Sequence, residues 1–325
     1  MIGEKKFSKR KKGKHITRKR IAYVFLAATF FIMLLIFLLA HISQKRFLNY
    51  AAPKAAIVDH LSLSYPNPNF SKKVQSIIKE ISLPVDYYPS EEVDVNLYRN
   101  LPMHNYKIIL FRVHSTAECS VEDQPPFVVF FTSEEYNTIS HVGDQLAMRV
   151  VYVNFPEPHQ STTGYFGITP SFIKESINGR FNESIIIAMG CDSLKYTSMA
   201  EAFIERGAKA YIGWTGPVSS SHTDKATSHL LQKLIIENRT LENAIQETMM
   251  EVGPDPFHNS TLAFYPDEAG NLNIIKILNS EQTHEISSMK SANSPYLETL
   301  LLNIMILAML TVDANLKIYR FLPLR

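Results

Sequence analysis

The feature that most constrains the fold is a largely apolar run at residues 184–190, which ends at Cys191. A run of this kind is typical of a buried strand in a parallel sheet that is covered by helices on both faces. A second apolar run, residues 106–113, ends in the same way at His114. His114 and Cys191 are 77 positions apart, which leaves room for another sheet element and a crossover between them. We therefore expect two neighbouring strands to deliver an imidazole and a thiol to one sheet edge.

Strand-like and helix-like segments alternate along the rest of the chain. Apolar residues at 74, 77, 78 and 81 have helical spacing, for example. Predicted strands occupy residues 55–59, 84–88, 106–113, 184–190 and 208–214, and predicted helices lie around residues 74–81, 170–177, 199–206 and 223–237, with another after Thr240. This alternation predicts an α/β fold with a mostly parallel central sheet. Two further β-rich runs, residues 127–131 and 148–153, suggest an inserted hairpin or extra edge strands.

Charge is concentrated at the N-terminus. Residues 1–20 carry ten of the 33 Lys and Arg side chains but only one of the 31 Asp and Glu side chains. The remainder holds 23 basic and 30 acidic side chains, a net charge of −7. The main domain therefore offers no basic surface for nucleic acid, and no nucleic-acid partner is expected.

An uncharged, almost wholly apolar stretch begins at Ile21 and ends at Ala40. Its length matches the roughly 20 residues that a helix needs to cross a bilayer, and it exceeds the apolar core of about 7 to 15 residues in a cleaved signal peptide. No small-residue cleavage site follows it. We expect a membrane anchor with the basic tail in the cytoplasm, which places the main domain outside the cytoplasm.

A second apolar stretch, residues 300–312, is short for a membrane span and fits a spanning helix or an interfacial or packed helix. Basic residues behind it would suit a cytoplasmic C-terminus. The protein is thus expected to cross the membrane once or twice, and its oligomeric state is left open. The expected segments are a basic tail (1–20), a transmembrane helix (21–41), a stalk (42–54), the main domain (55–280), a linker (281–295), a second transmembrane or interfacial helix (296–318) and a tail (319–325).

The two cysteines, Cys119 and Cys191, are too few for a disulfide scaffold, although an oxidising compartment would permit one bridge between them. An external domain would also be open to N-glycosylation. Four Asn-x-Ser/Thr sequons are present, at Asn69, Asn182, Asn238 and Asn259.

The order of these segments resembles a known family. A strand ending in His, a strand ending in Cys, a small-residue helix, the Gly-Ala turn at Gly207 and a strand ending in Trp214 resemble the caspase and gingipain clan of cysteine peptidases, with the CHAT-like branch most similar. The segment that begins at Asp224 also looks like the D-x-A-T start of that family's next helix. The resemblance covers residues 55–265. It implies a caspase-like three-layer α/β sandwich, here preceded by a transmembrane helix.

The resemblance also implies a catalytic site. Cys191 matches the family's nucleophile and His114 its base, and a peptide or protein would be the substrate. The backbone N–H groups of Cys191 and Ser115 would face the oxyanion, although the family usually has Gly at the position of Ser115. Trp214, Thr215 and Gly216 match the edge along which a peptide adds as a strand. No Asp is required by the dyad, and Asp59 would help to shape the floor of the site.

Other interpretations of these residues remain open. Cys191 could be a buried, inert thiol, or it could form a disulfide with Cys119, which would leave an inactive surface binding module. His222 or His229 could serve as the base instead, but the residues around Cys191 lack the two glycines of a nucleophile elbow.

Two neighbours of the expected site also have alternative roles. Asp192 is either a specificity residue or an acid at a helix start, and Trp214 is either a groove wall or a core aromatic. No metal-binding or nucleotide-binding pattern is present, so no cofactor is expected.

Overall fold

The structure is a computed structural model that describes residues 30–31, 34–35, 52–119, 125–154 and 164–278, with residues 118 and 119 described by their backbone alone. The strands are β1 (Lys54–Asp59), β2 (Val85–Pro89), β3 (Tyr106–Arg112), β4 (Ser115–Cys119), β5 (Phe127–Glu135), β6 (Val150–Val153), β7 (Tyr165–Ile168), β8 (Ile185–Ala188), β9 (Ala210–Trp214) and β10 (Leu262–Tyr265). The α-helices are α2 (Pro68–Lys79), α3 (Val95–Asn100), α4 (Val142–Leu146), α5 (Pro170–Glu175), α6 (Ser198–Glu205), α7 (Ser220–Leu231) and α8 (Leu241–Val252).

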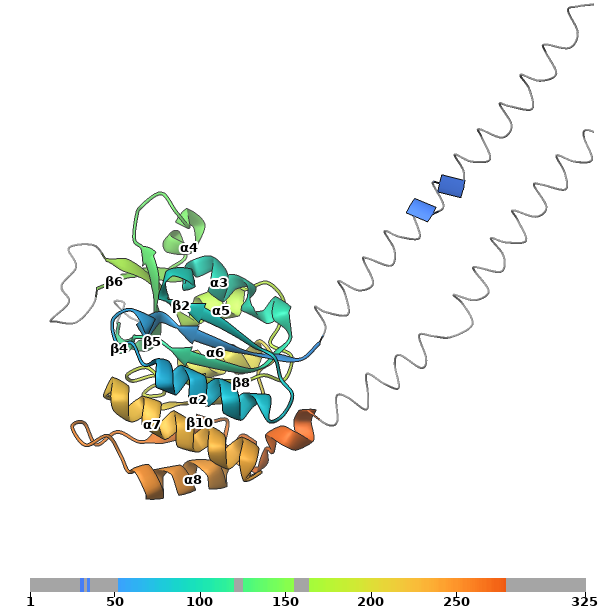
Figure 1. The fold of residues 1–325 in the computed structure, drawn as a ribbon. Coiled ribbons are helices and arrows are strands. Elements are labelled where there is room, and N and C mark those ends of the chain that lie inside the picture. Colours follow the sequence, from blue (N-terminus) through green and yellow to red (C-terminus); the bar gives the residue numbers. More distant parts are fainter. Residues whose placement is uncertain (1–29, 32–33, 36–51, 120–124, 155–163, 279–325) are drawn as a thin grey trace, which may run out of the picture.

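Six strands form the central sheet in the order β10-β9-β8-β3-β1-β2 (Figure 1). All neighbouring pairs are parallel except β10 with β9. The chain leaves β1 for β2 on one side and then crosses to β3 on the other, so the strand order reverses between β1 and β3. Ligands of open α/β sheets bind beyond the carboxyl ends of the strands at such a switch point.

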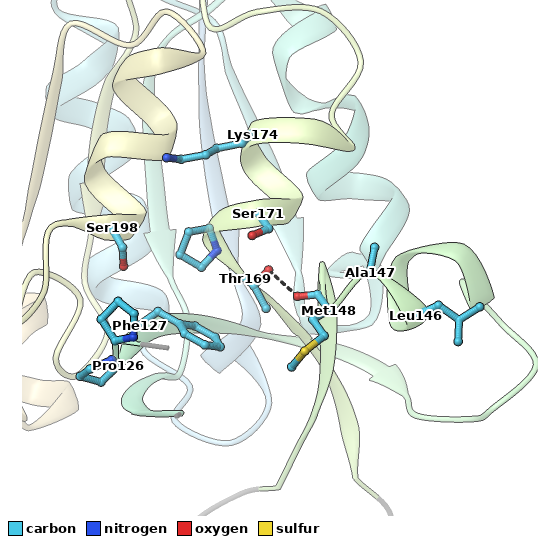
Figure 2. Close-up of a pocket in the computed structure, with 11 residues that line it drawn as sticks. Pro126, Phe127, Leu146, Ala147, Met148, Thr169, Ser171, Lys174 and Ser198 are labelled. Atoms are coloured by element: carbon cyan, nitrogen blue, oxygen red, sulfur yellow. Dashed lines mark hydrogen bonds between the residues drawn. The ribbon is translucent and has the colours of Figure 1, made fainter. Parts of the chain in front are cut away.

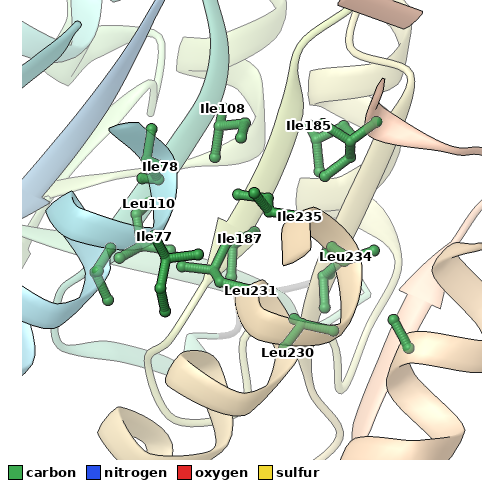
Figure 3. Close-up of a cluster of buried hydrophobic side chains, with 14 of the residues drawn as sticks. Ile77, Ile78, Ile108, Leu110, Ile185, Ile187, Leu230, Leu231, Leu234 and Ile235 are labelled. Atoms are coloured by element: carbon green, nitrogen blue, oxygen red, sulfur yellow. The ribbon is translucent and has the colours of Figure 1, made fainter. Parts of the chain in front are cut away.

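Helices cover both faces of this sheet, which makes a mixed α/β sandwich of three layers. On one face, α2, α7 and α8 close a core of aliphatic side chains. Figure 3 shows side chains of β3 and β8 packed against those of α2, α7 and the π-helical turn Gln232–Ile236 that continues α7; among them are Ile77, Ile78, Ile108, Leu110, Ile185, Ile187, Leu230 and Ile235. The other face is covered by α3, α5, α6 and a smaller sheet.

Side-chain alternation explains why the strand sequences are apolar throughout. Ile108 and Leu110 of β3 belong to the first core, whereas Ile109 and Phe111 belong to the second. Successive side chains of a strand point to opposite faces, and both faces here are buried. The prediction of a mostly parallel sheet is therefore confirmed.

The smaller sheet is antiparallel and has the order β4-β5-β7-β6. The apolar runs at residues 127–131 and 148–153 lie in β5 and β6, but β7 separates them. Of the two expected arrangements, the hairpin is therefore wrong, while β6 does lie at an edge, that of the smaller sheet. Their pairing through β7 depends on tertiary packing that the local pattern does not contain.

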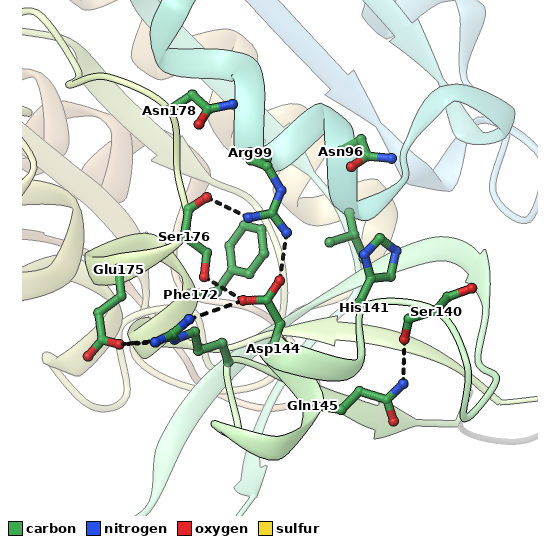
Figure 4. Close-up of polar contacts among 12 residues, drawn as sticks. Asn96, Arg99, Ser140, His141, Asp144, Gln145, Phe172, Glu175, Ser176 and Asn178 are labelled. Carbon is green, nitrogen blue, oxygen red and sulfur yellow. Dashed lines mark hydrogen bonds and ion pairs between the residues drawn. The ribbon is translucent and has the colours of Figure 1, made fainter.

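A charged cluster fixes α4, which lies between β5 and β6 in the chain, to the body of the domain (Figure 4). The carboxylate of Asp144 lies 2.6 Å from an Arg99 Nη atom and 3.5 Å from one of Arg149, and it accepts a hydrogen bond from the hydroxyl of Ser176 at 2.6 Å. Arg99 donates in turn to the Ser176 carbonyl. These contacts join α4 to α3 and α5.

Helix ends differ from the expectations in detail. Helix α7 begins at Ser220, three residues before the predicted start. Thr240 is the N-cap residue of α8, but its side chain makes no capping hydrogen bond. Strand β10, which no sequence pattern predicted, runs back along β9.

The chain enters and leaves the sheet on the same side. Lys54 opens β1 at the amino edge, and β10 begins beside Trp214 and ends beside Tyr211, so the helical residues 274–278 follow at the amino edge as well (Figure 1). The expected membrane segments at 21–41 and 296–318 fall outside the described residues, apart from four positions of the first. Within the part of the chain that the structure describes, no helix has the length and apolarity of a membrane span.

Candidate active site

The carboxyl ends of β3 and β8 bring His114 and Cys191 to the same sheet edge. The two strands pair in parallel with Phe111 opposite Ala188, and each candidate residue follows three positions later. The loops beyond the strands stay in contact, because the Ser115 hydroxyl donates to the Cys191 carbonyl at 2.6 Å. The expected adjacency of these two strands is confirmed.

Gly190 permits this close approach. A Cβ atom at this position would lie 2.2 Å from the Ser115 Oγ and 2.5 Å from the Val113 carbonyl oxygen. Both distances are far below van der Waals contact, and one of the atoms belongs to the backbone. The loop before Cys191 can therefore lie against the loop that carries His114 only if residue 190 is glycine.

The His114 ring is partly buried among aromatic side chains. The ring centroid of Tyr65 lies 5.8 Å away, that of Phe131 6.1 Å away and that of His60 5.6 Å away. Sequence reasoning missed His60. The signal was present, however, because His60 directly follows the predicted strand at residues 55–59 and therefore reaches the same edge.

The thiol of Cys191 lies against the backbone of Val218. Its Sγ atom is 3.4 Å from both the carbonyl oxygen and the amide nitrogen of Val218. Burial raises the pKa of the thiol most strongly. The Val218 backbone lowers it, and the carboxylates of Asp192 and Asp255 make smaller contributions that raise it. In this conformation the thiol is protonated at neutral pH, so it is not yet an activated nucleophile.

The backbone orientation of Ser115 follows from its place in the ladder with β5. The amide of Phe131 donates to the His114 carbonyl, and Ser115 is opposite Phe130 in the next pair of the ladder. Hydrogen-bonded and non-bonded pairs alternate in an antiparallel ladder, so the Ser115 N–H points away from β5. The hydrogen bond from the Ser115 hydroxyl to the Cys191 carbonyl places Ser115 where the loop after β3 meets the loop after β8.

Asp59 lies in a buried ion-pair cluster. The Arg112 guanidinium contacts Asp59 at 2.8 Å and Asp224 at 2.7 Å, and the Tyr87 hydroxyl donates to the other oxygen of Asp59. Asp59 is only 2% exposed. The carboxylate thus supports the floor of the edge from below and does not face a substrate directly.

Asp192 does not start a helix, because α6 begins six residues later, at Ser198. It occupies a left-handed turn with φ of 54°. Its amide donates to the Gly216 carbonyl at 2.9 Å, and its carboxylate lies 3.6 Å from the ammonium group of Lys195. The interpretation as a helix-start acid is therefore wrong.

The segment expected to add a peptide strand is bonded on both sides to the chain itself. The Trp214 carbonyl accepts from Leu194, and the Thr215 amide donates to Thr261 beside β10. The Trp214 side chain is fully buried, with its indole N–H 2.9 Å from the hydroxyl of Thr223. An open edge at Trp214–Gly216 is a wrong expectation, because this backbone is already bonded to Thr261 and to the loop after Cys191. A groove wall at Trp214 is also wrong, because its side chain is a core aromatic packed against α7.

The two alternative bases have other contacts. His222 contacts the Gly253 carbonyl and packs 5.7 Å from the Trp214 ring, while His229 lies 3.4 Å from Glu251. Cys191 is a free cysteine in the structure, which does not bear out the alternative disulfide to Cys119. The side chain of Cys119 lies outside the described residues.

The described residues hold no group of three or more His, Cys, Asp or Glu side chains arranged for a metal ion. The side chains of all four sequon asparagines are exposed, namely Asn69, Asn182, Asn238 and Asn259.

A separate hollow of about 380 Å³ lies where β5 begins and β7 ends, next to the first residues of α5 and α6 (Figure 2). Its walls are largely apolar, with Phe127, Met148 and Pro170 among them. The ammonium group of Lys174 at its rim is 2.9 Å from Glu205. Neither His114 nor Cys191 lines this hollow, so it is distinct from the candidate active site.

Comparison with known proteins gives no family assignment. No protein-family model matches the sequence, and no curated protein matches it significantly.

Proposed function

We propose that this protein is a membrane-anchored, extracytoplasmic cysteine endopeptidase with a caspase-like fold, in which Cys191 and His114 form the catalytic dyad. The observation that carries the proposal is the parallel pairing of β3 with β8, which puts both residues three positions beyond facing strand ends. The contact between Ser115 and the Cys191 carbonyl supports it.

The proposed reaction begins when His114 takes the thiol proton and the Cys191 thiolate attacks the carbonyl carbon of a peptide bond. The carbonyl π electrons move to the oxygen, where the amides of Ser115 and Cys191 stabilise the negative charge. His114 then gives its proton to the leaving amine as the C–N bond breaks. Water next hydrolyses the thioester, which restores the thiol and releases the acid product.

The chemistry requires the thiol to leave its contact with Val218. The proposal therefore includes a rotation about the Cα–Cβ bond of Cys191 that frees Sγ from Val218 and brings it to His114. The raised pKa of Cys191 belongs to the resting conformation, and a nearby imidazole would lower it by stabilising the thiolate. Substrate binding is the natural trigger for such a change.

Anchoring is part of the same proposal. The basic tail and the apolar stretch from Ile21 to Ala40 support a cytoplasmic N-terminus followed by one span. Both described ends of the domain lie at the amino edge of the sheet. The proposed site would therefore face away from the membrane, towards soluble proteins or the external domains of other membrane proteins.

The test is cleavage of a diverse peptide mixture by the full-length chain in detergent, read by mass spectrometry. We expect new peptide termini with the wild type and with Cys119→Ser, and none with Cys191→Ala or His114→Ala. Cleavage that persists in Cys191→Ala would contradict the proposal.

A second candidate function is a catalytically inactive binding module. The resting contacts of the thiol and the covered edge at Trp214–Gly216 favour it. It predicts no cleavage with or without reductant, and equal peptide binding by the wild type and Cys191→Ala.

A further inference from the structure

We propose that His60 is a positioning residue for His114: it holds the backbone of the catalytic base by accepting a hydrogen bond from the His114 amide. The inference rests on the proposed peptidase function and adds a third residue to its machinery. No sequence motif indicates this role.

The topology brings His60 to the base. His60 follows β1 immediately, and β1 pairs in parallel with β3, so both histidines lie beyond the switch point of the sheet. The His114 amide donates to Nδ1 of His60 at 3.4 Å. The two rings meet edge to face, with an interplanar angle of 78°.

A second hydrogen bond fixes the other end of the His60 ring. It joins the ring to the backbone of Thr132, and it raises the pKa of the imidazole, as a bond from a ring N–H to a carbonyl does. Because Nδ1 accepts from His114, the donor is Nε2. The ring therefore links the end of β1 to the His114 loop and to β5.

Burial determines the protonation state of this ring. His60 is 3% exposed, and burial, followed by the charge of His114, lowers its pKa to about 3. The ring is neutral at physiological pH, so Nδ1 keeps the lone pair that the His114 amide needs. A buried polar ring without partners would be costly, and these two bonds offset that cost.

The consequence is a fixed backbone at the base. The His114 amide is bound by His60, and its carbonyl accepts from Phe131 at 3.0 Å. With both backbone groups held, the imidazole of His114 moves mainly by its own side-chain rotations. A displacement of about 1 Å in a catalytic group can cost roughly a hundredfold in rate, so this restraint matters for turnover.

Two substitutions separate the two bonds of the ring. In His60→Asn, the side-chain oxygen takes the place of Nδ1 and preserves an acceptor for the His114 amide. In His60→Gln, the side-chain nitrogen takes the place of Nε2 and preserves the donor to Thr132 while the acceptor is lost. His258→Gln, at an exposed position, is the control.

The experiment measures two quantities on the full-length chain in detergent: peptide cleavage rates and hydrogen exchange of the His114 amide. For His60→Gln we expect kcat to fall about ten- to a hundredfold with KM within twofold, and amide exchange to rise at least about tenfold. In His60→Asn, both kcat and the exchange rate of the His114 amide should stay close to the wild-type values. His258→Gln should match the wild type in both quantities.

Equal kcat and equal amide exchange in His60→Gln and His60→Asn would overturn the positioning role, because a purely structural histidine would not distinguish the two. The exchange measurement needs no activity. If the wild type cleaves nothing, the peptidase proposal fails, and the exchange of the His114 amide still decides whether His60 holds it.

Discussion

The two halves of the candidate site are held in different ways. On the histidine side, buried side chains fix the edge: Arg112, two residues before His114, is paired with Asp59 and Asp224, and His60 holds the His114 amide. On the cysteine side, the thiol lies 3.4 Å from the backbone carbonyl and amide of Val218, and no charged side chain is paired with it among the described residues.

The difference indicates which half can change. Breaking a buried ion pair by removing one partner costs about 3–5 kcal/mol, whereas a thiol contact with a backbone amide is weak. We therefore expect the histidine side to be preformed. Conversion from the resting to the reactive site would occur on the cysteine side, through the loop that contains Val218.

The largest effect is expected from breaking the ion-pair cluster. Arg112→Met would leave two buried carboxylates without their shared cation, and the free energy of unfolding should fall by about 3–5 kcal/mol. Urea unfolding followed by the fluorescence of Trp214, the single tryptophan, measures this change. Lys174→Met, which breaks the exposed pair with Glu205, should cost under about 1 kcal/mol. Similar decreases in the free energy of unfolding of Arg112→Met and Lys174→Met would contradict the view that the buried ion pairs hold the histidine side.

The next effect is a pH dependence from His60. Its folded-state pKa is lowered, so the unfolded chain binds an additional proton between about pH 6.5 and 3. The contribution of His60 to the free energy of unfolding is therefore fully present above pH 6.5. It decreases by about 1.4 kcal/mol for each pH unit of acidification, down to about pH 3. His60→Gln should make the acid-side slope shallower by that amount. An unchanged slope would show that the ring is not buried as a neutral group.

A smaller effect on stability is expected from Asp255, which holds the loop on the cysteine side of the site. The Asp255 carboxylate accepts from the amides of Ser219, Phe257 and His258, which keeps the loop beside Val218 in place. Burial alone would raise the pKa of Asp255, but these bonds lower it overall, so their contribution is lost only near or below pH 3.8.

Asp255→Ala should therefore cost about 1–3 kcal/mol and increase the rate of Cys191 alkylation by iodoacetamide several-fold. The exposed Asp267→Ala is the control. Equal alkylation rates in Asp255→Ala and the wild type would mean that this loop does not restrain the thiol.

The sequence predicted the central sheet well because its strands are buried on both faces, and residues 106–113 and 184–190 could hardly be anything else. The shared edge for His114 and Cys191 followed from that. Strand β10 was missed because it is only four residues long and lies at the edge of the central sheet. The burial of Trp214 was missed because its side chain packs against α7, a contact between separate elements that the local pattern does not contain.

Other features of the site depend on contacts between distant segments. The position of His60 directly after a predicted strand indicated the sheet edge, but its contact with His114 could be inferred only once β1 and β3 were seen to be neighbours. The contact between the Cys191 thiol and the Val218 backbone could not be predicted either, because the two residues are 27 positions apart in the sequence.

The most direct test of the central claim is modification of Cys191 by peptidyl acyloxymethyl ketones, which need a thiolate, a nearby acid–base group and an oxyanion site together. Our account predicts that these reagents modify Cys191 in the wild type and that His114→Ala slows the reaction by about a hundredfold or more. Labelling after denaturation would confirm that the thiol is free in both proteins. A free Cys191 that no peptidyl ketone modifies, or that is modified equally fast in His114→Ala, would contradict the account.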